Sequence, residues 1–175
     1  MASPEVHAFH VRRLEPADDR SSFRSGNVDL DRFFVRYAGQ NQFRHHIGTT
    51  YVAVSPTGVI AGFATVTASE IAPAIVPAAK GKRLPGYPVP VLRLARLAVD
   101  ERAKGKGVGR LLLRSILVLA QRMSAEVGCI GVVVDAKPES VAFYERLGFV
   151  PLAAVSGELG DRPQPRPLFL EIGAW

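Results

Sequence analysis

Residues 91–135 read VLRLARLAVDERAKGKGVGRLLLRSILVLAQRMSAEVGCIGVVVD, and the order of apolar and glycine-rich segments in this stretch indicates the fold. An apolar strand over 91–100 leads into a loop with three alternate glycines, and a helix follows over 108–128 because apolar side chains recur along one face. These side chains are Leu112, Ile116, Leu119 and Met123. The apolar run 129–135 then predicts a buried strand. Two strands joined through a helix predict a parallel pair within a sheet.

The segments before this unit predict a strand, a helix and a hairpin. Residues 6–14 are typical of a strand, and residues 25–46 of an amphipathic helix that Asn27 caps and Gly48 ends. Residues 49–55 and 59–68 predict two antiparallel strands around a short turn. A long loop follows over 71–90, where Pro and Gly are frequent, and long loops in compact domains are commonly functional.

The segments after the unit predict a short helix over 138–148, with Gly148 at its C-terminal cap, and two strands over 149–156 and 167–172. The order β, α, β, β, β, α, β, α, β, β contains no internal repeat. We therefore expect an α/β or α+β fold, with a mixed sheet flanked by helices, in a single domain over residues 1–175.

Composition restricts the class of protein. With 175 residues, 47% apolar, the chain is too hydrophobic for disorder, and it is long enough to bury a core. Its single cysteine, Cys129, has no internal disulfide partner, and the first residues contain no apolar run suited to a signal peptide. No apolar stretch approaches the ~20 residues of a membrane span. We expect a cytoplasmic protein that does not associate with a membrane.

The net charge of +6 is unevenly distributed. Residues 71–125 hold eleven Lys or Arg against two acidic residues, a local net charge of +9, and the remaining residues sum to −3. Such a basic stretch is either a solvated surface or the footprint of a polyanion, namely the phosphates of a cofactor or of a nucleic acid.

The glycine-rich loop Lys104–Arg110 is the strongest candidate for a ligand site. Glycines allow tight turns and close approach of the backbone, so several N–H groups at the start of a helix can converge on phosphate oxygens. The alternative is an ordinary glycine-rich turn. A P-loop requires GxxxxGK followed by Ser or Thr, which is absent, and a Rossmann reading is weak because the loop follows about a hundred residues of other structure.

The strand LARLAVD, the loop KGKGVGRLLL and the later AFYERLGF resemble the GCN5-related N-acetyltransferases (GNAT). The family's pyrophosphate loop carries Arg or Gln, two residues, Gly, one residue, and Gly or Ala. Lys104 is the preferred residue for the first place, because we expect Gly109 to lie directly before the helix, and Arg102 takes that place if the register slips by two. The resemblance implies a GNAT fold with a sheet of six to seven strands, and acetyl-CoA in a cleft between splayed parallel strands.

The resemblance also implies roles for individual residues. Tyr144 would be the general acid that protonates the departing CoA thiolate, the alternative being a core tyrosine with a satisfied hydroxyl. Cys129 is expected in the core, since the family forms no acyl-enzyme, and no metal is expected. The residues expected to bind acetyl-CoA are Leu97, Ala98, Val99, Lys104, Gly105, Lys106, Gly107, Val108, Gly109, Arg110, Lys137 and Ser140.

Many GNAT enzymes carry a carboxylate on the strand before the loop to deprotonate the amine, and VLRLARLAV contains none. At pH 7 a lysine amine is only about one part in 2,500 neutral, whereas an α-amine is about one part in six neutral. A site poor in bases therefore favours α-amines.

The segments FRSGNVDLDRFF, QNQ and PVPVLRLARLAVD are similar to the GNAT toxins of bacterial type II toxin-antitoxin modules, which acetylate the α-amino group of aminoacyl-tRNA and block translation. That resemblance implies a cognate DNA-binding antitoxin, of ribbon-helix-helix type, and a homodimer. Basic residues beyond those needed for the cofactor would contact tRNA: Lys80, Lys82, Arg83, Arg93 and Arg96. The alternatives are a GNAT enzyme that acetylates a protein N-terminus or a small-molecule amine, and a non-catalytic module that binds CoA or RNA.

Overall fold

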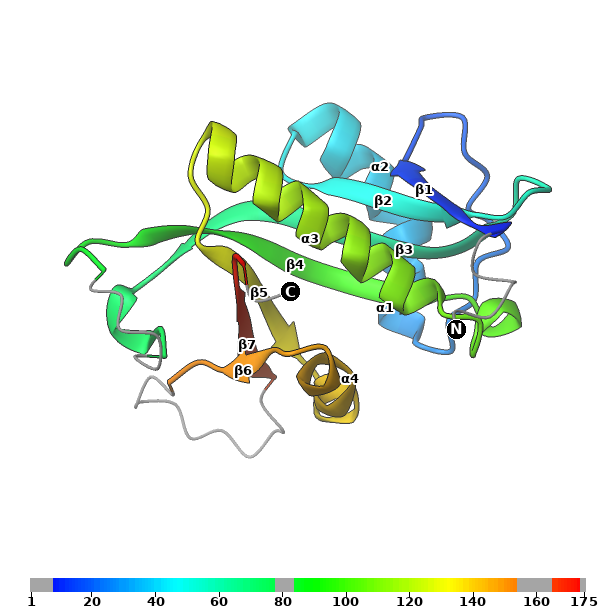
Figure 1. Ribbon diagram of the computed structural model, residues 1–175. Coiled ribbons are helices and arrows are strands. Elements are labelled where there is room, and N and C mark those ends of the chain that lie inside the picture. Colours follow the sequence, from blue (N-terminus) through cyan, green and yellow to red (C-terminus); the bar gives the residue numbers. More distant parts are fainter. Residues whose placement is uncertain (1–7, 78–83, 154–164, 174–175) are drawn as a thin grey trace. The chain divides into compact units, whose positions relative to one another are not determined.

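The computed structural model describes residues 8–77, 84–153 and 165–173 (Figure 1). Their strands form a seven-stranded sheet in the order β1-β2-β3-β4-β5-β7-β6, and the predicted order of strands and helices is confirmed. The chain divides into two compact units, Met1–Thr67 with Ala95–Val118 and Ala68–Leu94 with Leu119–Trp175. Strands β3 (Ile60–Ile71) and β4 (Val89–Val99) and helix α3 (Val108–Glu126) contribute residues to both. The single domain over 1–175 stays a prediction.

The first unit contains the predicted hairpin. Strand β1 (His10–Arg13) pairs antiparallel with β2 (Thr49–Val54), and β2 pairs antiparallel with β3. Aromatic rings form the centre of this unit's core, where the rings of Phe34 and Phe63 stack with centroids 4.3 Å apart and Phe23 meets Phe34 edge-on at 4.8 Å. Buried aromatic pairs of this kind contribute beyond their buried area.

The predicted helix over 25–46 is a continuous helical run with two π-helical segments. It consists of α1 (Val28–Arg32), η2 (Phe33–Tyr37), α2 (Ala38–Gln40) and η3 (Asn41–His45). Asn27 caps it as predicted, because its side chain accepts hydrogen bonds from the N–H groups of Asp29 and Leu30. The expectation that Gly48 ends the helix is wrong: His46 takes the left-handed conformation (φ 53°) and ends it two residues earlier.

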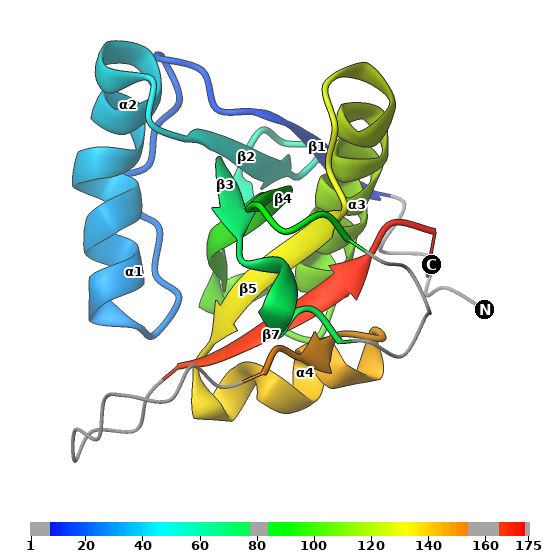
Figure 2. The same ribbon diagram turned by 90° about the vertical axis from the view of Figure 1, so that its left-hand side faces the viewer.

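The second unit contains the parallel pair. Residues Leu92–Leu94 of β4 pair with Val132–Val134 of β5 (Gly131–Ala136), which confirms the predicted parallel strands. Strand β7 (Arg166–Glu171) runs antiparallel along β5, and the short β6 (Val150–Pro151) pairs with β7 (Figure 2). The divergence of β4 from β5 beyond Leu94 stays a prediction.

The remaining elements of both units are short. In the second unit a 3₁₀ turn η4 (Pro73–Ile75) interrupts the predicted long loop, and η7 (Pro138–Ser140) leads into α4 (Val141–Arg146). The core of this unit includes Val91, Val133 and Phe169. In the first unit, η6 (Glu101–Ala103) lies between β4 and the glycine-rich loop. This short turn therefore separates the predicted loop from a buried acidic residue, Asp100.

Candidate active site

Asp100, the residue that follows β4, anchors the predicted cofactor loop. Its side chain is 1% exposed and accepts hydrogen bonds from the backbone N–H groups of Arg24 (3.1 Å) and Arg102 (2.9 Å). The Arg102 guanidinium adds a bidentate pair, with Nε at 2.8 Å from Oδ1 and Nη2 at 3.0 Å from Oδ2. Burial raises the pKa of Asp100, but these hydrogen bonds outweigh it and lower the pKa to about 2. The anchor is therefore charged at neutral pH.

Two further contacts hold the loop against the segment before α1. The N–H of Glu101 donates to the Arg24 carbonyl (2.8 Å), and the Lys104 ammonium donates to the Ser25 carbonyl (2.7 Å). Gly26 lies in this contact with φ +90°, and a Cβ there would meet the Glu101 carboxylate at 2.9 Å. The Lys104 side chain is thus part of the scaffold that holds the loop, in addition to its predicted role in cofactor binding.

The loop itself requires glycine at two places. Gly105 and Gly107 both have φ +79°, a conformation that L side chains rarely adopt. The expectation that Gly109 lies directly before the helix is wrong, because α3 begins at Val108 and Gly109 belongs to its first turn. The conformation of the glycines therefore fits the register that places Arg102, Gly105 and Gly107 at the three positions of the family's pattern.

The start of α3 provides donors suited to phosphate oxygens. The N–H of Leu111 donates to the Gly107 carbonyl (3.0 Å), so the N–H groups of Val108, Gly109 and Arg110 precede the helical hydrogen-bond ladder. The positive end of the helix dipole and the exposed Lys106 and Arg110 add favourable potential. These residues fit the pyrophosphate of acetyl-CoA.

We predict that Gly105→Ala weakens acetyl-CoA binding by more than it weakens the fold. A Cβ at Gly105 meets no atom within 4 Å, so the stability cost is backbone strain alone, about 1–2 kcal/mol. The added methyl group also narrows the approach of a phosphate to the loop. Calorimetric titration should show at least a several-fold rise in the Kd for acetyl-CoA.

Gly58→Ala is the matched control for Gly105→Ala, because Gly58 has φ +84° and open space in the β2–β3 turn. Both variants should lose the same stability in a denaturant titration. Equal acetyl-CoA affinities in the two variants would contradict a cofactor role for the loop.

The strand residues predicted to contact the cofactor lie at the end of β4 in the first unit. Ala98 is buried in the aromatic core, whereas Leu97 and Val99 are half-buried. These two half-buried positions leave surface that a ligand could contact, and a cofactor role for them stays a prediction.

Tyr144 lies on α4 in the second unit, with its ring buried and its hydroxyl free. The residue is 5% exposed, and its ring meets those of Phe143 and Phe149 edge-on at centroid distances of 5.1 and 5.3 Å. No described residue hydrogen-bonds the hydroxyl, and the described residues contain no fully buried side-chain oxygen without a partner. The hydroxyl oxygen therefore retains access to solvent or to a ligand. Burial raises the pKa of Tyr144, so the phenol keeps its proton at neutral and alkaline pH.

Lys137 and Ser140 flank the turn that precedes α4. Lys137 is exposed, and Ser140 is half-buried and donates its backbone N–H to the Lys137 carbonyl (2.8 Å). The Ser140 hydroxyl makes no capping bond to α4. Lys137, Ser140 and Tyr144 belong to the same unit, and the cofactor contacts of Lys137 and Ser140 stay a prediction.

The structure describes two of the five predicted tRNA contacts. Arg96 in the first unit places its guanidinium carbon 3.7 Å from the centroid of the Phe33 ring, a cation–π contact, and burial lowers its pKa. Arg93 in the second unit forms an ion pair with Asp135. The predictions for Lys80, Lys82 and Arg83 lie outside the described residues.

Asp135 is the polar residue of this region that the sequence analysis left without a role. It is the penultimate residue of β5 and is half exposed, and its ion pair with Arg93, 42 residues earlier in the chain, links β5 to β4. Parallel strand pairing was the signal that could have placed the two residues together.

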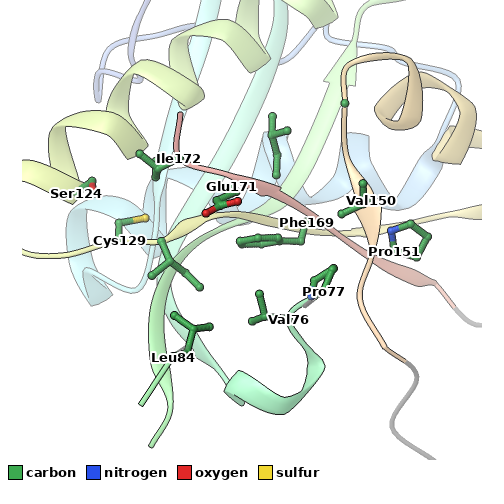
Figure 3. Close-up of a pocket in the computed structure, with 13 residues that line it drawn as sticks. Val76, Pro77, Leu84, Ser124, Cys129, Val150, Pro151, Phe169, Glu171 and Ile172 are labelled. Carbon is green, nitrogen blue, oxygen red and sulfur yellow. The ribbon is translucent and has the colours of Figure 1, made fainter. Parts of the chain in front are cut away.

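A cavity of about 450 Å³ lies elsewhere in the second unit, at the opposite end of β5 (Figure 3). Apolar side chains, among them Leu84, Ile130 and Phe169, form most of its wall. Cys129 contributes too: it is buried, donates its Sγ hydrogen to the Gly131 carbonyl (3.3 Å), and has a pKa raised by burial. This supports the predicted core role of Cys129. None of the residues predicted for catalysis or cofactor binding lines the cavity.

Neither a group of metal-ligating side chains nor a membrane-spanning helix is present among the described residues. No three or more His, Cys, Asp or Glu side chains among residues 8–77, 84–153 and 165–173 are grouped so that they could hold a metal ion. Over the same residues, every helix is too short or too polar to cross a bilayer.

Comparison with known proteins identifies relatives over most of the chain. The model of the GNAT acetyltransferase domain matches residues 46–151. A tRNA-acetylating toxin from Mycobacterium tuberculosis is 32% identical over 139 residues, 79% of this chain and 82% of the relative.

Two solved structures share the fold. The structure of AtaT complexed with acetyl-methionyl-tRNAfMet is 26% identical, with a TM-score of 0.78 over 93% of this chain and 94% of that one. The structure of AtaTR bound with AcCoA is also 26% identical, with a TM-score of 0.76 over 95% of both chains.

Proposed function

Because the chain belongs to the GNAT family of acetyltransferases, we propose that it transfers the acetyl group of acetyl-CoA to the α-amino group of an aminoacyl-tRNA. The assignment of aminoacyl-tRNA as the substrate rests on one observation, the 32% identity to a tRNA-acetylating toxin over 79% of the chain. The similar AtaT structure, which contains an acetylated methionyl-tRNA, supports the same substrate class.

Different residues of this chain bind the cofactor and supply the proton. Acetyl-CoA supplies the acetyl group as a thioester. The N–H groups at the start of α3, with Lys106 and Arg110, bind its pyrophosphate, and the end of β4 contacts the rest of the cofactor. Tyr144 holds at its hydroxyl oxygen the proton that the departing sulfur requires, and the raised pKa of Tyr144 keeps that proton in place.

Basic side chains outside the cofactor loop are proposed to bind the phosphates of tRNA. Arg96 offers a guanidinium held on the Phe33 ring, and Lys80, Lys82 and Arg83 add positive charge to the same stretch of chain. Arg93 already has a carboxylate partner, so a phosphate contact by Arg93 would compete with Asp135.

The relatives are named as toxins, and this supports the view that the chain acts together with a partner protein. We infer that the chain acts in the cytoplasm, forms a homodimer, and is neutralised by a DNA-binding antitoxin of ribbon-helix-helix type. Exposed apolar side chains on and around the helical run of the first unit offer a surface for a protein partner. They are Val28, Tyr37, Phe43 and Ile47.

The decisive experiment incubates the protein with charged tRNA and labelled acetyl-CoA. The expected product is N-acetyl-aminoacyl-tRNA from at least one isoacceptor, and its absence from every isoacceptor would overturn the proposal. Binding to tRNA should also weaken steeply with salt, because several phosphates are neutralised. Turnover of a peptide N-terminus or a small amine without RNA, with weak salt dependence, would favour a different GNAT substrate.

A further inference from the structure

Three polar side chains from neighbouring strands form a cluster in the second unit. The Arg93 guanidinium on β4 donates from Nη1 to Asp135 Oδ2 at 2.7 Å and from Nε to the Ser69 hydroxyl at 3.3 Å. Ser69 belongs to β3 and Asp135 to β5. The cluster therefore includes residues of three strands, and the Arg93 guanidinium hydrogen-bonds to a side chain on each of the other two strands.

The register of the strands shows which face of the sheet carries the cluster. Arg93 is aligned with Val133, and Asp135 lies two residues further along β5, so the side chains of Arg93 and Asp135 project from one face. The Ser69 hydroxyl joins them through its hydrogen bond with the Arg93 guanidinium. Val132 and its partner Leu170 project from the other face, and a Cβ at Gly148, just after α4, would lie 3.5 Å from the Leu170 side chain. The end of α4 and the Arg93–Asp135 pair thus lie on opposite faces of the β4–β5 pair.

The pair also lies at the end of the strands where ligands bind. In sheets with parallel strands, ligands bind beyond the carboxyl ends of the strands, and Asp135 is the penultimate residue of β5. The apolar cavity lies at the amino end of the same strand, beside Cys129 and Ile130. The position of Asp135 therefore suits a substrate, whereas that of the cavity does not.

One carboxylate oxygen of Asp135 is available to accept a hydrogen bond from a ligand. Its side chain is 53% exposed, and Arg93 uses Oδ2 alone. Oδ1 makes no hydrogen bond to any described residue. A carboxylate that a guanidinium orients and that keeps a free oxygen is suited to accept a hydrogen bond from an amino group, and bonds of this kind to charged groups are strong.

We propose that Asp135 binds the α-amino group of the acceptor through Oδ1, with Arg93 and Ser69 as positioning residues for its carboxylate; this inference rests on the proposed function. The strand before the glycine-rich loop carries no carboxylate, and Asp135 on the next strand of the sheet supplies one. Its negative charge also favours the positive charge that develops on the nitrogen as the new C–N bond forms.

The test compares two forms of one tRNA, the aminoacyl ester and the hydroxyacyl ester in which a hydroxyl replaces the amine. The wild-type protein should bind the aminoacyl form more tightly, by about 10-fold or more. Asp135→Asn keeps the shape of the side chain and should bind both forms equally, with an unchanged Kd for acetyl-CoA. A wild-type preference retained in Asp135→Asn would overturn the proposal.

A matched control and a positioning variant complete the design. Asp29→Asn alters an exposed Arg–Asp pair in the first unit and should leave the preference for the amine intact. Arg93→Ala should reduce the preference, and Arg93→Lys should restore part of it. Equal weakening of both tRNA forms by Arg93→Ala, with a shallower salt dependence, would instead make Arg93 a phosphate contact and would overturn its positioning role.

The outcomes separate this inference from the proposed function. If the wild-type protein acetylates no aminoacyl-tRNA, the proposed function fails. If it does acetylate one while Asp135→Asn keeps both its rate and its preference for the amine, the role of Asp135 alone fails.

Discussion

Tyr144→Phe is expected to lower the rate of acetyl transfer by about 10²–10⁴-fold, the range that a positioned general acid contributes. The substitution removes one oxygen and keeps the ring, so the edge-on contacts with Phe143 and Phe149 remain. Because the hydroxyl has no hydrogen-bond partner among the described residues, its loss costs the fold little. Single-turnover rates and calorimetric titration of acetyl-CoA should show slow transfer with nearly unchanged cofactor binding.

Tyr51→Phe is the matched control for this experiment. Tyr51 is a half-buried tyrosine on β2 that is not among the predicted site residues, and the same substitution there should leave transfer unchanged. A Tyr144→Phe protein that turns over at the wild-type rate would show that another group supplies the proton. Because burial raises the pKa of Tyr144, ionisation of its phenol should cause no loss of rate up to about pH 9.

Asp100→Ala is expected to destabilise the protein by about 1–3 kcal/mol, because it leaves two part-buried backbone N–H groups without their acceptor and removes the partner of the Arg102 guanidinium. It also releases the start of the cofactor loop from the segment before α1, so acetyl-CoA binding should weaken in the same variant. Denaturant titration and cofactor titration measure the two effects.

Asp18→Ala provides the comparison for Asp100→Ala. Asp18 also accepts a bidentate Arg pair, from Arg12 at 2.7 and 2.8 Å, and a backbone N–H, but it lies far along the chain from the cofactor loop. The Asp18→Ala protein should be less stable than the wild type but should bind acetyl-CoA with the same affinity. If both variants bind acetyl-CoA as the wild type does, Asp100 has no part in shaping the cofactor site.

The same carboxylate predicts a pH dependence of stability. Its folded pKa of about 2 lies below the value of about 3.9 expected in the unfolded chain, so the folded state holds fewer protons between these values. The stabilisation from Asp100 is therefore complete above about pH 4 and is lost as the pH falls toward 2. Asp100→Ala should show a smaller loss of stability over that interval than the wild type.

Local sequence was sufficient for much of the fold. Apolar periodicity identified α3 and β5, Asn27 identified the start of α1, and three alternate glycines identified the loop before α3. Each of these features depends on interactions between residues that are close in the chain, such as a side chain that caps the next turn. The exact ends were less predictable: His46 rather than Gly48 ends the first helical run, because a left-handed residue satisfies the last carbonyl groups wherever it occurs.

The sequence by itself determined the family, the glycine-rich loop and Tyr144, because their signals lie in contiguous residues. Only the tertiary structure decided which long-range contacts hold the glycine-rich loop in place and which polar side chains meet across strands. The anchor of the loop joins Asp100 to Arg24, the Lys104 ammonium reaches Ser25, and Arg93 meets Asp135 across parallel strands. Such pairs are separated by 42 to 79 residues, and no local pattern encodes them. They form only when strand register and packing bring distant segments of one unit together.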